Sequence, residues 1–145
     1  MGQQQLLLIT LSVIIVGVAV SVGVNMFQSG AVEANRQALV SDVVNAAAKA
    51  QKYYRTPEAM AGGGQNFDGF KLSTPDTANP NGVFTISTSK PNSNAGISGS
   101  VTPISGSSGT IYVVASGKEK GDDGTNPVKV YAKVTADSIQ SVILN

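Results

Sequence analysis

Residues 6–27 read LLLITLSVIIVGVAVSVGVNMF, and this stretch decides which architectures are open to the rest of the chain. Its few polar side chains are uncharged, and the first charged residue of the chain is Glu33. At ~1.5 Å per residue, about 22 residues of helix extend roughly 33 Å, enough to cross a bilayer core of about 30 Å. The stretch therefore predicts a helix that is apolar on all sides and buried in lipid or in other protein.

The start of the chain differs from a typical secretory signal peptide. Such a peptide opens with a basic region and a shorter apolar run, and no Lys or Arg precedes the apolar residues here. We interpret the missing basic region as the mark of a short leader already removed, which places the mature start at Met1 or Gln3. A plain signal anchor is the alternative.

The helical pattern continues past residue 27, now with a single apolar face. Between residues 32 and 54 apolar side chains recur at intervals of three and four residues, the spacing of one stripe on a helix. Thr56-Pro57 predicts the end of this helix, because a residue before proline is driven out of the α region. The predicted stripe comprises Val32, Leu39, Val40, Val43, Val44, Ala47, Ala50, Tyr53 and Tyr54. Of the two tyrosines, we expect one to lie under the sheet and the other to face outward.

The residues beyond the helix predict short strands. Residues 58–81 form a loop-rich connection in which Phe67, Phe70 and Leu72 are the expected core anchors. Alternating polar and apolar residues then predict strands at 82–89, 98–104, 110–116, 128–136 and 138–144. The 98–104 strand is the weakest, because its Pro103 suits only an edge strand. In 128–136 we expect Lys129 and Lys133 to point outward and the valines inward.

Together these elements predict an α+β fold: one long N-terminal helix of about 50 residues packed at its C-terminal half against a small antiparallel sheet of four or five strands. The helix occupies 1–57, with a membrane or filament-core half at 1–30 and an amphipathic half at 31–57. Residues 58–145 form the globular β-sheet domain. The apolar stripe of the helix is the surface that this sheet is expected to cover.

Composition argues against several classes of function. The chain has no Cys and no His, which excludes disulfides, thiol chemistry, Cys-based zinc sites and a histidine general base. A net charge of +1 gives no basic face for nucleic acid. Ser116-Gly117-Lys118 is the nearest Ser–Lys pairing, and such a stretch after a strand is ordinary turn chemistry. We therefore expect no enzyme activity, no cofactor and no nucleic-acid partner.

One loop concentrates oxygen ligands. Residues 119–126 contain Asp122 and Asp123, which with backbone carbonyls would supply part of the six to eight oxygens that Ca²⁺ requires. Asp-Gly and Asn-Pro in the same loop are also standard turn formers. The two aspartates are a weak calcium candidate, and a solvated turn is the favoured interpretation.

The layout of one long N-terminal helix, apolar in its first half and followed by a small antiparallel sheet, resembles a type IV pilin. The resemblance rests on residues 1–55 and chiefly on the run LLLITLSVIIVGVAVSV; the globular part carries no motif of the family. Pilins have a short leader that a dedicated peptidase removes. Their apolar helix first lies in the inner membrane and then becomes the core of a helical filament.

The resemblance implies a structural subunit, not an enzyme, that forms a homopolymer in an extracellular cell-surface filament. Its implied partners are other copies of the chain, the inner membrane before assembly, the leader peptidase and the pilus assembly machinery. The residues that it assigns to assembly are Met1, Gln5, Leu6, Leu7, Leu8, Val13, Ile14, Gly17, Val20, Gly23 and Phe27.

The chain departs from the family pattern at two points. Family members usually carry a glutamate at the fifth mature position, where it neutralises the terminal amine of a neighbouring subunit. Gln5 occupies that position if Met1 is the mature start, and Leu7 does if cleavage follows Gly2. Glutamine accepts a hydrogen bond but cancels no charge, so we expect an altered assembly mechanism. The C-terminal cysteine pair common in major pilins is also absent.

Two other functions fit the same sequence. A pseudopilin of a secretion machine would share the layout and form a short periplasmic fibre. A bitopic membrane protein with a ligand-binding outer domain would use the helix as an anchor only, and it would form no fibre.

Overall fold

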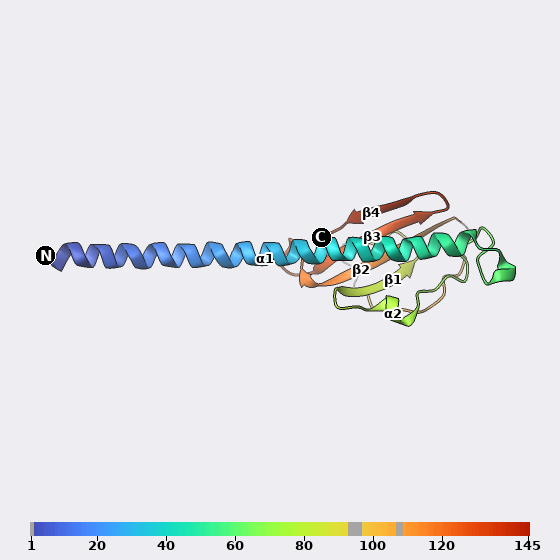
Figure 1. The fold of residues 1–145 in the computed structure, drawn as a ribbon, viewed down its shortest axis with the longest axis horizontal. Coiled ribbons are helices and arrows are strands. Elements are labelled where there is room, and N and C mark those ends of the chain that lie inside the picture. Colours follow the sequence, from blue (N-terminus) through green and yellow to red (C-terminus); the bar gives the residue numbers. More distant parts are fainter. Residues whose placement is uncertain (1, 93–96, 107–108) are drawn as a thin grey trace.

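The computed structural model describes residues 2–92, 97–106 and 109–145, which form a rod with a small sheet at one end (Figure 1). The predicted α+β fold is confirmed. The elements in chain order are α1 (Gly2–Arg55), a short 3-10 helix (Glu58–Met60), α2 (Thr74–Thr77), β1 (Gly82–Ser87), β2 (Thr110–Lys120), β3 (Pro127–Thr135) and β4 (Ile139–Ile143). We call the sheet, its loops and residues 31–55 of α1 the body, and residues 2–30 of α1 the apolar half.

Helix α1 runs unbroken for 54 residues and ends at Arg55, directly before the Thr56-Pro57 pair that predicts its end. The connection that follows folds back onto this end. The amide groups of Gly63 and Gln65 each donate to a carbonyl of the last helical turn, those of Tyr53 and Tyr54, at 2.8 Å. These bonds satisfy carbonyls that a helix end otherwise leaves without an intrahelical partner.

The sheet is an antiparallel meander of order β1-β2-β3-β4 that lies against the C-terminal half of α1 (Figure 1). Strands β3 and β4 lie within a residue of their predicted bounds, and β1 stops at Ser87 instead of residue 89. Strand β2 continues to Lys120, past a register irregularity between Ser116 and Lys120. The prediction of a turn at Ser116-Gly117-Lys118 was therefore wrong: these residues lie inside the strand.

The predicted strand at 98–104 was also wrong. This segment bonds to a loop instead of to the sheet: the Ile104 amide donates to the Phe70 carbonyl at 2.9 Å, and the Gly69 amide donates to the Ile104 carbonyl at 2.7 Å. Pro103 has no amide hydrogen with which to continue a ladder. The edge of β1 carries an isolated bridge from Ala78 to Val83.

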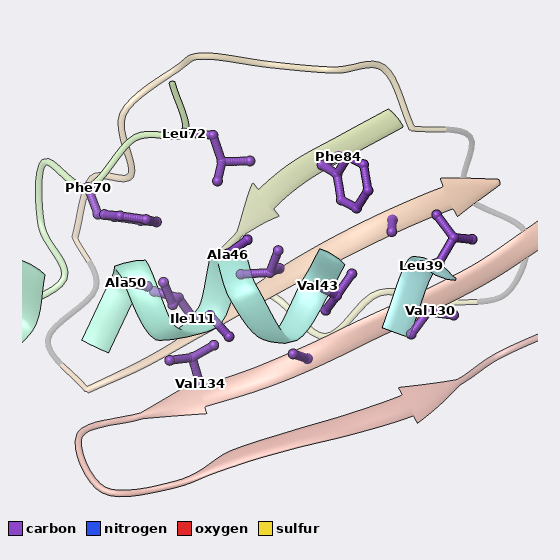
Figure 2. Close-up of a cluster of buried hydrophobic side chains, with 14 of the residues drawn as sticks. Leu39, Val43, Ala46, Ala50, Phe70, Leu72, Phe84, Ile111, Val130 and Val134 are labelled. Atoms are coloured by element: carbon purple, nitrogen blue, oxygen red, sulfur yellow. The ribbon is translucent and has the colours of Figure 1, made fainter. Parts of the chain in front are cut away.

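The core lies between α1 and the facing side of the sheet (Figure 2). The buried helix residues are Leu39, Val43, Ala46, Ala47 and Ala50, which pack onto Phe84, Ile111, Val130, Val134 and their neighbours. The expected anchors Phe67, Phe70 and Leu72 are all buried, as predicted. Val44, which belongs to the predicted stripe, is 38% exposed. The buried stripe instead includes Ala46, which lies on the side of the helix away from Val44.

Two predictions about which side chains are exposed to solvent need correction. Both tyrosines at the end of α1 pack on core aromatics, Tyr53 on Phe70 with ring centroids 5.5 Å apart and Tyr54 on Phe67 at 4.7 Å. Lys129 is on the sheet face away from α1, as predicted, but it is only 3% exposed. That face is crowded because Tyr131, itself buried, packs there against the ring of Tyr112 at 5.9 Å.

A glycine pair lets two helix side chains approach the sheet closely. Gly82 and Gly117 are cross-strand partners in β1 and β2. A Cβ atom added at either glycine would lie 2.9 Å from a methyl carbon of Leu39, and at Gly117 it would also lie 2.1 Å from Asn35 Oδ1. The two glycines thus form a notch in the sheet into which Leu39 and Asn35 fit.

Candidate functional site: the apolar half of the helix

The apolar half of α1 extends away from the body along its whole length (Figure 1). Every Leu, Ile, Val, Met and Phe in residues 6–27 is more than half exposed, and Phe27 reaches 81%. Among the described residues, none of the most apolar part of this helix is buried inside the molecule. Soluble monomers rarely leave such a continuous apolar surface uncovered. The helix is long and apolar enough to cross a membrane, which makes it compatible with membrane insertion.

The residues assigned to assembly lie on this exposed surface, with one outside the described residues. Met1 is the exception, and Gln5 is exposed near the tip of the helix. Exposed side chains of the set are Leu6, Leu7, Leu8, Val13, Ile14, Val20 and Phe27. Added Cβ atoms at Gly17 and Gly23 would meet nothing within 4 Å in the described part of the chain. Among the described residues these glycines face open space, and they leave flat places where another helix could approach.

Two polar side chains within the apolar half, Thr10 and Ser12, bond to the helix itself. The Thr10 hydroxyl donates to the Leu7 carbonyl at 2.9 Å, and the Ser12 hydroxyl donates to the Leu8 carbonyl at 2.7 Å. Such bonds to the preceding turn satisfy a hydroxyl without water. The segment can therefore be transferred into lipid or into a helix bundle without stranding these two donors.

At the base of the apolar half, an ion-pair cluster ties the β2–β3 loop to α1. Arg36 Nη1 bonds to Glu33 Oε2 at 2.9 Å, and Arg36 Nη2 bonds to Asp122 Oδ2 at 3.0 Å. The hydrogen bond that Arg36 donates to Glu33, aided by the carboxylate of Asp122, raises the pKa of Arg36, and burial opposes this only in part. Arg36 Nε is buried without a hydrogen-bond partner in the described residues.

The calcium candidate residues point in different directions. Asp122 faces Arg36, whereas Asp123 folds back on its own loop and accepts from the amides of Thr125 at 3.0 Å and Asn126 at 2.9 Å. The side-chain bond from Asn126 and these amides lower the pKa of Asp123. Within the described residues there is no group of three or more His, Cys, Asp or Glu side chains suited to a metal ion. This geometry favours the turn interpretation over the calcium one.

A second polar cluster, which the sequence analysis missed, fastens the loop before β1 to the helix. Asp42 Oδ2 accepts from the side-chain amides of Asn79 and Asn81, both at 2.8 Å. Asn35 Nδ2 donates to the Asn81 carbonyl at 2.9 Å. The Asn-Pro-Asn-Gly sequence at 79–82 is a turn signal, but nothing in it identifies Asp42 as the partner.

Comparison with family models, with curated proteins and with solved structures found no match to this chain. The candidate site is therefore interpreted from its own geometry.

Proposed function

We propose that this chain is a structural subunit that polymerises through the apolar half of α1 into an extracellular, type IV pilus-like filament. The observation that carries the proposal is the exposure of every large apolar side chain in residues 6–27, on a helix that extends beyond the body. A helix that is apolar on all sides must be covered by lipid or by protein. Neighbouring copies can cover one another's helices with a staggered contact that does not close and therefore grows a fibre.

The shape of the subunit supports the same function. The body lies at one end of α1 only, so many apolar halves can bundle while the bodies remain outside (Figure 1). Before assembly the same segment would hold the subunit in the inner membrane, where we place the leader peptidase and the assembly machinery. The self-satisfied hydroxyls of Thr10 and Ser12 suit both environments.

The first test is genetic. Deleting the gene for this chain should remove thin surface filaments from the cells that make it, as seen by electron microscopy, and an intact copy should restore them. Unchanged filaments in the deletion strain would overturn the proposal.

A substitution distinguishes a filament core from a plain anchor. Gly17→Leu keeps the segment apolar and adds a side chain where the described part of the isolated subunit has no atom within 4 Å. We expect the variant to remain in the membrane fraction at wild-type level but to assemble poorly, because close helix packing relies on small residues. Val16→Leu, a small change on the same segment, is the matched control. Normal filaments with Gly17→Leu would contradict helix bundling at this face. A chain that enters the membrane and never forms a fibre would instead be a bitopic membrane protein.

A further inference from the structure

A cavity lies where the apolar half of α1 meets the body. This junction groove has a volume of about 890 Å³ and is lined by helix residues between Asn25 and Arg36 and by loop residues between Lys118 and Gly124. Its size is within the roughly 300–1,000 Å³ range of small-molecule sites. Figure 1 places the C-terminus, whose last residue bonds to the same loop, near this end of the body.

The groove begins where the apolar segment ends. About 22 apolar residues fill a bilayer core of about 30 Å, which puts Phe27 at the edge of the hydrocarbon. Residues 28–36 and the loop beside them then lie at the depth of the lipid head groups. This placement rests on the membrane stage of the proposed function. Phe27, on the wall of the groove and largely exposed, occupies the depth at which aromatic side chains commonly meet the interface.

The charges of the groove are balanced. It is lined by three cations and three anions, namely Arg36, Lys118, Lys120, Glu33, Glu119 and Asp122. Arg36 is held by Glu33 and Asp122, whereas Lys118, Glu119 and Lys120 are all exposed. Two ammonium groups beside one carboxylate complement a ligand that carries a phosphate and an amine. A purely anionic ligand would meet the carboxylates as well as the lysines.

We propose that the junction groove seats the head group of a phospholipid with a primary amine, of the phosphatidylethanolamine class. Lys118 and Lys120 hold the phosphate, and the carboxylate of Glu119 accepts from the ammonium group. The acyl chains lie along the helix below Phe27. In this arrangement a lipid holds the body at a fixed height above the membrane before assembly.

The test uses the full chain in nanodiscs that contain equal parts of phosphatidylethanolamine, phosphatidylcholine and phosphatidylglycerol. Native mass spectrometry of the released protein reports which lipid stays bound. We expect the wild type to retain phosphatidylethanolamine preferentially. In the Lys118→Ala/Lys120→Ala variant, which lacks both lysines that hold the phosphate, the amount of bound phosphatidylethanolamine should fall about tenfold. Lys52→Ala/Lys71→Ala, which removes two exposed lysines outside the groove, is the matched control and should behave as wild type.

Glu119→Gln separates amine recognition from simple attraction to phosphate. This variant should retain phosphatidylethanolamine and phosphatidylcholine about equally, because the neutral amide no longer favours an ammonium donor. Equal retention of all three lipids by the wild type, or a preference for phosphatidylglycerol, would overturn the proposal.

Membrane insertion is measured separately, by flotation of the chain with vesicles of phosphatidylcholine. All variants should float, since their apolar half is unchanged, and a wild-type chain that does not float would overturn the lipid site. The filament proposal is tested by a different observation: normal filaments in the deletion strain would overturn it. If the chain floats and retains phosphatidylethanolamine but the cells' filaments do not depend on it, the lipid-site proposal stands and the filament proposal is overturned.

Discussion

Gly117→Ala should destabilise the body, although alanine is better suited than glycine to a strand. At an unstrained site with room for a methyl group, replacing glycine by alanine stabilises a protein by about 0.4–1 kcal/mol through the unfolded state. At Gly117 the new Cβ would lie 2.1 Å from Asn35 Oδ1 and 2.9 Å from Leu39 Cδ1. Helix and sheet must separate at this contact, or Asn35 must give up its bond to the loop before β1.

Overpacking of this kind costs roughly 1–3 kcal/mol, so the net loss after the unfolded-state gain is about 1–2 kcal/mol. For a body of this size the loss corresponds to a decrease of about 5–15 °C in melting temperature. The measurement is near-ultraviolet circular dichroism of the full chain in detergent micelles. The chain has 4 tyrosines, all in the body, so this signal follows the sheet and not the apolar half.

Asn35→Ala supplies the decisive comparison. It removes the atom at 2.1 Å and leaves the contact at 2.9 Å with a methyl group of Leu39, whose side chain can adjust. The cost of Gly117→Ala should therefore fall by at least half in the Asn35→Ala background, a coupling of about 0.5–2 kcal/mol. Gly109→Ala, with no described neighbour within 4 Å of its added Cβ, should leave the melting temperature unchanged or slightly raised. If Gly117→Ala lowers stability equally in the wild-type and Asn35→Ala chains, or does not lower it at all, the proposed contact of Asn35 and Leu39 with the two glycines is wrong.

Three further outcomes are expected from the same melting assay. Leu39→Ala should lower stability by about 2–5 kcal/mol, since this side chain is fully buried between helix and sheet; a loss below ~1 kcal/mol would contradict its place in the core. Asp123→Ala should lower the melting temperature at pH 7. Because hydrogen bonds hold the pKa of Asp123 below its ordinary value, its contribution is complete above about pH 4 and is lost as the pH falls, so variant and wild type should converge in acid. Calcium chloride or a chelator should leave the melting temperature unchanged, because Asp122 faces Arg36 and Asp123 faces its own loop; a rise with calcium would restore the metal interpretation.

Much of this fold follows from patterns that are local in sequence. The apolar run, the stripe spacing and Thr56-Pro57 each act within a few residues, and they correctly predict one helix ending at Arg55. Strict alternation likewise located β3, with Val128, Val130, Ala132 and Val134 buried against the helix side. The sequence also predicts that the apolar half needs lipid or other protein around it, because residues 6–27 have no charged side chain and no polar face.

The errors arise where the outcome depends on a distant partner. Residues 98–104 have the composition of a weak strand, but Ile104 bonds to Phe70, a residue of a separate loop. Lys129 alternates as a surface residue would, yet the ring of Tyr131 and its neighbours crowd the outer face. The partnership of Asp42 with two asparagines of a remote turn has no local signal either.

The polar clusters bear on the proposal that one continuous helix serves first in a membrane and then in a filament. The Asp42 cluster and the Arg36 cluster both fasten loops of the sheet to the middle of α1, and the body meets the apolar half at the junction groove, beside Asn25 and Phe27. Neither polar cluster involves residues 6–27, so in the proposed assembly those residues would exchange lipid for neighbouring helices without breaking either cluster. Because residues 6–27 are apolar on all sides of the helix, they must be covered by lipid or by other helices and not by water. We infer that assembly changes the partners of the apolar half while leaving the fold of the body as it is.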